Sequence, residues 1–258
     1  QYADKEPTRA VALVAAIVFA ISDALWFQSI RAEVYTLNLV IALALIALAL
    51  RWESDDDHAL TPLKVGAFLL GLGAGNHHLL LLALCPALAL LVLATQRHRS
   101  MVWRQLPVLF SALLAGLAIY ALLPIRAADA PMINYGHPDS PGRFLDVLMA
   151  RVFISSVTGD AIPYISNLAA ALDMFIRAIG PIWLLAAPIG CVLLWREKPR
   201  LGVFISLALL MNLATKVLMV LDPTNPDAAG YFQLSFALAL IAGAHALTAL
   251  TQAGPIGR

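Results

Sequence analysis

The chain has 258 residues, of which 61% are hydrophobic and only 13% charged, and its net charge at pH 7 is +1. Soluble domains carry about 25% charged and 45–50% apolar residues, so this composition excludes an ordinary soluble domain and indicates an integral membrane protein. No Lys/Arg-rich run points to nucleic acid. The two cysteines, Cys85 and Cys191, lie inside apolar runs, where buried thiols are expected rather than a disulfide framework.

Long apolar runs predict an all-α fold, a polytopic bundle of transmembrane helices. A spanning helix needs about 20 apolar residues, and shorter helices are tolerated inside bundles. We expect about eight spans, of which the third and fourth are short enough to form one broken helix: 10–29, 36–51, 63–77, 79–94, 107–124, 179–195, 201–221 and 231–250. Residues 1–250 are therefore predicted to form a single transmembrane module, followed by a short tail at 251–258.

The distribution of Lys and Arg predicts which loops face the cytoplasm. Residues 97–104 and 196–200 carry the basic excess that marks cytoplasmic loops. The helix count then places the tail 251–258 in the cytoplasm. It places the turn around Glu33, the pair His77–His78 and the loops 125–167 and 222–230 on the outer face.

The long outer loop is predicted to contain a helix near residues 141–157. Ser140 is a suitable N-cap, and Pro141 suits the first helical position. The following apolar residues recur at helical spacing opposite charged ones, which is typical of an amphipathic helix lying at the membrane interface.

The turn "SIRAEVYTLN" permits two interpretations. Tyr35 could belong to an interfacial aromatic belt, with Arg31 and Glu33 solvated or paired with each other. Alternatively, these residues belong to a site on the outer face.

The stretch "GLGAGNHHLLLL" combines small residues with two histidines. Gly71, Gly73 and Gly75 should let helices approach closely. His77 and His78 point about 100° apart on a helix, so they are poor joint ligands for one metal. Hydrogen bonding to a substrate phosphate or sugar fits them better.

The stretch "LPIRAADAPMINYGHPDSP" contains further candidates. The planar guanidinium of Arg126 suits a phosphate, either of a substrate or of a phospholipid headgroup. Asn134, Tyr135 and His137 follow in a long loop whose prolines and aromatic residues indicate order, and long loops in compact proteins are usually functional.

Two ionisable residues, Asp23 and Lys216, fall within expected spans. A charge in the hydrocarbon is costly and is by default a functional hypothesis. The two could instead pair with each other, or Lys216 could snorkel outward. Asp173 and Arg177 are spaced i, i+4 and are expected to form a helix salt bridge.

Four stretches, "WFQSIRAEVYTLNLVIALALIALALRW", "GLGAGNHH", "LPIRAADAPMINYGHPDSPGRFLDVLMAR" and "GYFQLSFALALIAGA", occur in an order that resembles a family of polytopic membrane proteins. The family looks like bacterial relatives of the endoplasmic-reticulum O-mannosyltransferase that modifies plexin and receptor-kinase ectodomains, within the GT-C superfamily of membrane glycosyltransferases. The resemblance covers nearly the whole chain.

The resemblance implies a polyprenyl-phosphate sugar as donor, a protein or other acceptor, and an active face towards the periplasm or exterior of a bacterial inner membrane. It implies catalytic roles for Glu33 and His77. Contacts with substrate would come from Tyr35, Asn76, His78, Arg126, Asn134, Tyr135, His137 and Tyr231. Assistance by a divalent metal stays open.

The resemblance also implies a first outer loop with an acidic general base, and no such loop precedes Gln1. We therefore expect the chain to be the middle of a catalytic module, which lacks that base. Two other functions stay open. One is a non-catalytic subunit that meets other membrane subunits, and the other is a transporter with Asp23 and Lys216 in an ion path.

Overall fold

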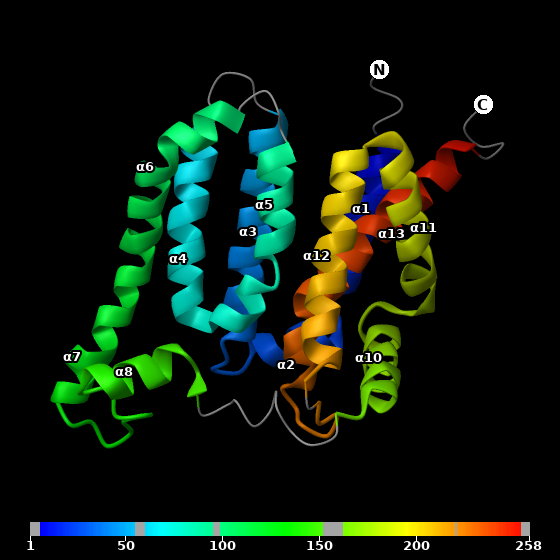
Figure 1. Cartoon of the computed structure of the whole chain (residues 1–258). Coiled ribbons are helices and arrows are strands. Elements are labelled where there is room, and N and C mark those ends of the chain that lie inside the picture. The colour runs from blue at the N-terminus through cyan, green and yellow to red at the C-terminus, as the bar shows by residue number, and fades with distance from the viewer. Residues whose placement is uncertain (1–5, 55–59, 95–98, 152–161, 220, 254–258) are drawn as a thin grey trace.

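The computed structural model describes residues 6–54, 60–94, 99–151, 162–219 and 221–253. Within these ranges every regular element is a helix, so the predicted all-α bundle is confirmed. The helices form two neighbouring groups, α3 to α8 in one and α1, α2 and α10 to α13 in the other (Figure 1).

The elements follow one another along the chain with short connections. They are α1 (Glu6–Ala20), α2 (Asp23–Ser29), α3 (Tyr35–Ser54), α4 (Leu60–Leu82), α5 (Cys85–Ala94), α6 (Arg99–Leu117), η3 (Ala118–Ala121), α7 (Leu122–Ala128), α8 (Pro141–Leu148), α10 (Tyr164–Ile179), α11 (Pro181–Glu197), α12 (Pro199–Val217), η5 (Ala228–Phe232) and α13 (Gln233–Ala253).

Five helical segments of the described chain are long and apolar enough to cross a membrane, and the number rises to seven if each of two bent pairs is one span. The five are Tyr35–Ser54, Leu60–Leu82, Ser100–Ala128, Pro199–Val217 and Ala228–Ala253. They identify an integral membrane protein. Eight spans were expected, and the difference lies at the fourth, because α5 has only 10 residues.

The first expected span, 10–29, is broken in the structure. The Oγ atom of Ser22 accepts a hydrogen bond from the amide of Leu25 at 3.3 Å, which caps the start of α2. The same hydroxyl donates to the carbonyl oxygen of Phe19 at 2.8 Å. The chain bends by 56° here, so Asp23 lies on a separate short helix.

A second break lies at His77, where the third and fourth spans were expected to separate. His77 has non-helical backbone angles (φ −155°, ψ 86°) inside α4. Its Nδ1 atom accepts a hydrogen bond from the amide of Leu80 at 3.5 Å, so the side chain caps the turn that follows. The kink turns the end of α4 towards α5 (Figure 1).

Glycines set the close approach of α4 and α6, as predicted for Gly71. A Cβ atom at Gly71 would collide with the carbonyl oxygen of Leu113, and one at Gly116 with the carbonyl oxygen of Phe68. Backbone contact through small residues is a common basis of helix association in membranes, where no hydrophobic force drives apolar helices together.

Among the described helices, α13 contributes the most buried residues, followed by α3. Its residues Leu238 and Ala242 are fully buried, whereas large apolar residues of α6, such as Phe110 and Leu114, are exposed in the way that lipid contact requires. The rings of Phe175 and Phe236 meet edge to face, with centroids 4.8 Å apart, and join α10 to α13.

Residues 125–167 were expected to form one long outer loop with a single helix. Helix α8 begins at Pro141 with Ser140 in the N-cap position, as expected, although no side-chain hydrogen bond completes the cap. Residues 152–157 of the predicted helix lie outside the described residues. Helix α10 was missed as a separate element. It begins inside the expected loop and ends at Gly180, whose φ of 80° begins a 105° bend into α11.

The two ends of the bundle differ in composition. The end of α3, the end of α11 and the start of α12 lie at the same end of the bundle (Figure 1). Arg196 is in the last turn of α11, Lys198 links the two helices, and Arg200 is in the first turn of α12. The opposite end carries α2, residues 30–34, α7, α8 and residues 221–232. We call this second region the polar end.

Candidate functional site

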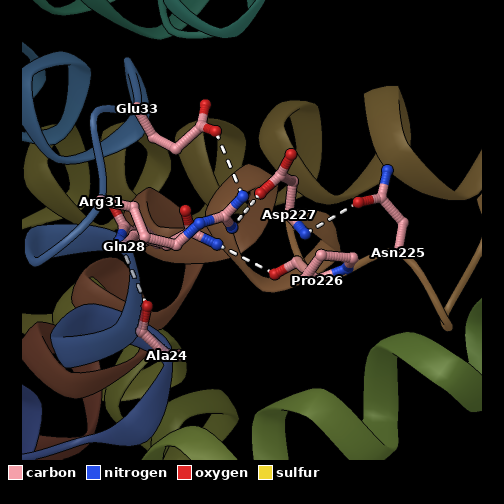
Figure 2. Close-up of polar contacts among 8 residues, drawn as sticks. Ala24, Gln28, Arg31, Glu33, Asn225, Pro226 and Asp227 are labelled. Carbon is pink, nitrogen blue, oxygen red and sulfur yellow. Dashed lines mark hydrogen bonds and ion pairs between the residues drawn. The ribbon is translucent and has the colours of Figure 1, made fainter.

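Arg31 joins two carboxylates at the polar end. Its Nη1 atom donates a hydrogen bond to Oδ1 of Asp227, and its Nη2 atom lies 3.3 Å from Oε1 of Glu33. The side chains of Arg31, Glu33 and Asp227 are 31%, 28% and 23% exposed, so all three are half-buried. Figure 2 shows the guanidinium extended towards both acids. The Arg31 guanidinium is shared by the carboxylates of Glu33 and Asp227, so the formal net charge of the cluster is −1.

Helix α2 holds Arg31 against the 222–229 segment. Gln28, which is 1% exposed, donates from Nε2 to the carbonyl oxygen of Pro226 at 3.0 Å (Figure 2). The guanidinium carbon of Arg31 lies 4.9 Å from the centre of the Phe27 ring, within range of a cation–π interaction. These contacts fix the position of the guanidinium next to Asp227.

The segment that carries Asp227 is itself held by local hydrogen bonds. The amide and hydroxyl of Thr224 donate to Oδ1 of Asp222 at 2.9 and 2.6 Å. These bonds lower the pKa of the exposed Asp222 carboxyl. The amide of Asp227 donates to Oδ1 of Asn225 at 2.9 Å. Such Asx turns explain why the "DPTNPD" segment can present Asp227 without regular structure.

Three aromatic rings from distant parts of the chain lie beside this ion cluster. The centroids of Tyr35 and Tyr231 are 5.0 Å apart, and His77 lies 6.0 Å from Tyr35 and 6.3 Å from Tyr231. Gly230 permits the arrangement, because a Cβ atom there would lie 2.6 Å from the Tyr35 ring. Tyr35 follows Glu33 by two residues and Tyr231 follows Asp227 by four, so the aromatic rings and the ion cluster form one site.

The end of α4 is tied to the same site. Asn76 donates from Nδ2 to the carbonyl oxygen of Val34 at 2.9 Å, which joins α4 to the 30–34 turn. The kink at His77 then directs its ring towards Tyr35 and Tyr231. His78 is half-buried beside it. The predicted residues Glu33, Tyr35, Asn76, His77 and Tyr231 are thus brought together.

Lys216 is buried near this site, with 4% of its surface exposed. Its Nζ atom donates to Oγ1 of Thr215 at 2.7 Å, and the ammonium group is within electrostatic range of His77. The suggested pairing with Asp23 is not formed. Asp23 is exposed at the start of α2, whereas Lys216 is buried on α12.

A cavity of about 480 Å³ adjoins the ion cluster. It lies between α2, α10 and the 222–229 segment, and its lining includes Phe27, whose ring contacts the Arg31 guanidinium. Its polar lining comes from Asp23, Asp173, Arg177, Thr224 and Asn225. The expected Asp173–Arg177 salt bridge is confirmed, with 2.9 Å between Nη2 and Oδ2.

Arg126 is not brought to this site. Its helix, α7, lies beyond α4 as seen from α2 (Figure 1), and its guanidinium is 4.0 Å from the carboxylate of Asp129. The side chain is 72% exposed. The predicted convergence of Arg126 with Glu33 and His77 therefore fails. Helix α6 and η3 pack on the side of α4 that is turned away from α3, and α7 continues from η3 on that side (Figure 1).

The 134–137 residues also lie apart from the ion cluster, in the turn between α7 and α8. Gly136 has a φ of 70° and packs against Val147 of α8, while His137 has a φ of 44°. Tyr135 is 61% exposed. Their predicted contact with substrate remains a prediction.

Sequence reasoning allowed for the pairing of Arg31 with Glu33, which the structure shows, but missed Asp227. The one available signal for Asp227 was its place in a polar turn between two apolar runs, which did not reveal its partner. Within the described ranges, no group of three or more His, Cys, Asp or Glu side chains is arranged to hold a metal ion.

Residues 2–101 match the family model described as "Protein O-mannosyl-transferase TMEM260 N-terminal domain". The match covers less than half of the chain. No curated protein and no solved structure matches the chain. The matched region includes Arg31, Glu33, Tyr35, Asn76 and His77. This first part of the chain is therefore similar to the N-terminal domain of that protein O-mannosyltransferase family.

Proposed function

We propose that the chain is a membrane glycosyltransferase module of the O-mannosyltransferase type, which transfers a sugar from a polyprenyl-phosphate donor to a hydroxyl group of a protein acceptor. The observation that carries this proposal is the meeting of Arg31, Glu33 and Asp227 with Tyr35 and His77 at one end of the bundle. Four of these five residues lie in the region similar to the O-mannosyltransferase domain.

Transfer requires a base near the acceptor. The acceptor oxygen bonds to the anomeric carbon, the bond from that carbon to the phosphate oxygen breaks, and the acceptor proton passes to a base. Glu33 and Asp227 are the carboxylates of the site, and both are partly exposed. Arg31 contacts both, and either carboxylate can accept a proton from a hydroxyl group held beside it.

The donor phosphate needs positive charge away from this net negative cluster. Lys216 and His77 provide hydrogen-bond donors next to Tyr35, and within the described chain no carboxylate forms an ion pair with Lys216. We assign the phosphate to their side of the site. Arg126 keeps a separate proposed role, contact with a lipid phosphate or headgroup at α7.

The 480 Å³ cavity suits the transferred sugar or the acceptor rather than the phosphate. Its size lies in the range of small-molecule sites, about 300–1,000 Å³. Asp23, Asp173 and Arg177 sum to a charge of −1, which disfavours an anion. Their donors and acceptors, together with the ring of Phe27, suit a neutral group with several hydroxyls.

We propose further that the polar end faces the exterior or periplasm of a bacterial inner membrane. Arg196, Lys198 and Arg200 lie at the opposite end of the bundle, and basic loops mark the cytoplasmic side. A lipid-linked donor in the outer leaflet would then reach the site from the membrane.

The test is sugar transfer by the purified protein in lipid nanodiscs. Polyprenyl-phosphate mannose carrying a radiolabel is supplied with a peptide that contains Ser and Thr, and label in the peptide is counted. Glu33→Gln and Asp227→Asn should each lower turnover, and loss of a general base typically costs about 10²–10⁴-fold.

Asp139→Asn is the matched control, because Asp139 is an exposed carboxylate paired with Arg143 at 3.1 Å beside α8. It should leave turnover unchanged. If Glu33→Gln and Asp227→Asn behave like this control, or if the unaltered protein transfers no label to any such peptide, the proposal fails.

A further inference from the structure

A small cavity is lined in part by Tyr35 and Tyr231. Its volume is about 10 Å³, and Asn38 of α3, Asn212 of α12 and Gln233 of α13 also line it. These three amide side chains are 3%, 1% and 1% exposed. Amide side chains so deep in an apolar bundle are costly unless each of their polar atoms has a partner.

Two acceptor atoms of this cavity have no partner in the protein. They are Oδ1 of Asn38 and Oε1 of Gln233. The donor side of Gln233 is used, because Nε2 donates to the carbonyl oxygen of Ala24 at 3.3 Å. Asn212 is also bonded, from Nδ2 to the carbonyl oxygen of Ala208 at 3.0 Å. Two residues that line the cavity, on two different helices, therefore each carry an unpaired carbonyl oxygen.

We infer that one ordered water molecule occupies this cavity and joins α3 to α13. A water needs a space of about 10–15 Å³ and two to four polar partners, and both conditions are met. Its two O–H groups can donate to Oδ1 of Asn38 and Oε1 of Gln233. Its oxygen can accept from a hydroxyl of the Tyr35–Tyr231 pair.

A metal cation is a poorer occupant than water. Among the described residues, no carboxylate lines the cavity. The buried ammonium-bearing Lys216 follows Asn212 by one helical turn on α12, and its charge disfavours a second cation there. A neutral donor of two hydrogen bonds satisfies the unpaired oxygens without added charge.

The water would also set the positions of Tyr35 and Tyr231 in the candidate site. Tyr35 begins α3, Tyr231 precedes α13, and Asn38 and Gln233 lie on the first turn of these two helices. A bridge between Asn38 and Gln233 therefore fixes the separation of the two tyrosine rings. Asn38 and Gln233 become positioning residues, a role that rests on the proposed function, whereas the water itself does not.

The first measurement is a high-resolution electron cryomicroscopy structure of the protein in nanodiscs. We expect a density peak about 2.7–3.0 Å from both Oδ1 of Asn38 and Oε1 of Gln233. An empty cavity, a direct bond between the two side chains, or a peak at metal-ligand distances of about 2.4 Å would each overturn the inference.

The second measurement compares thermal unfolding of Asn38→Leu, Gln233→Met and the double variant. Each single change leaves the other oxygen with a poorly held water, so we expect Tm to fall by about 2–4 °C or more. The double variant should lose less than the sum of the two. Ser235→Ala is the control, because its buried, unpaired hydroxyl lies outside the cavity lining, and its removal should not lower Tm.

A shared water would be contradicted if the single variants kept the Tm of the Ser235→Ala control. It would also be contradicted if the Tm losses of the two single variants added up to the loss of the double variant. The positioning role is tested separately in the mannose-transfer assay. Asn38→Leu should lower kcat several-fold while KM for the donor stays within about twofold, since geometry rather than donor contact is changed. Water density without any transfer would reject the proposed function alone, and transfer by a protein with a dry cavity would reject this inference alone.

Discussion

Arg31 donates a hydrogen bond to Asp227, a residue 196 positions further along the chain. This single contact joins the turn after α2 to the turn before η5, and it places a carboxylate that follows α12 next to Glu33. The two side chains are half-buried, which makes their pairing stronger than that of a fully exposed ion pair.

Removal of the guanidinium should destabilise the protein. We expect Arg31→Met to lower the free energy of unfolding by about 1–3 kcal/mol, because two half-buried carboxylates then lose their partner. Thermal unfolding in one detergent measures the loss. Arg143→Met should cost at most about 1 kcal/mol, since the Arg143–Asp139 pair is exposed. Equal losses for the two variants would show that the Arg31 cluster has no special role.

Removal of the buried ammonium should have opposite effects on stability and on transfer. Lys216→Met replaces a buried charge, which has no ion pair in the described chain, by an apolar side chain of similar length. We expect a gain of roughly 1–3 kcal/mol in stability and a fall in mannose transfer that comes mainly from a higher KM for the donor.

The matched control for that change is Lys198→Met, at an exposed position between α11 and α12, where neither quantity should change. If the Lys216→Met variant is less stable than the unaltered protein, Lys216 has a buried anionic partner. If the variant keeps the KM of the unaltered protein for the donor, Lys216 does not bind the donor phosphate.

The contact between α4 and α6 should not tolerate a side chain. Gly71→Ala forces a methyl group against the carbonyl oxygen of Leu113, and we expect a loss of about 1–3 kcal/mol, measured by thermal unfolding. Gly142→Ala is the control, because nothing lies within 4 Å of its added methyl group. That change, within α8, should stabilise by about 0.5–1 kcal/mol. A neutral Gly71→Ala would mean that the two helices separate readily.

The orientation of the bundle can be tested by labelling in intact cells. In a protein with Cys85 and Cys191 replaced by alanine, Ser140→Cys should react with a membrane-impermeant maleimide, because α8 lies at the polar end. Ser100→Cys, at the start of α6 near the opposite end, should react only after the cells are opened. The reverse pattern would place the proposed site in the cytoplasm and contradict a donor in the outer leaflet.

Local sequence determined the elements whose interactions are local. The apolar runs predicted most of the spanning helices, because a helix in lipid satisfies its own backbone groups and needs only length and apolar side chains. The Asp173–Arg177 pair followed from i, i+4 spacing, and the start of α8 followed from Ser140 and Pro141.

Tertiary structure decided how those elements meet. The partner of Arg31 could not be identified from the sequence, because Asp227 follows it by 196 residues. Only the packing of α2 against the 222–229 segment brings the two side chains together. Arg126 and His77 were expected to share one site. They are separated because α6 packs on the side of α4 away from α3 and leads to α7, which carries Arg126. Helix packing depends on which small residues face one another, as Gly71 and Gly116 do, and hydropathy along the chain contains no information about that choice.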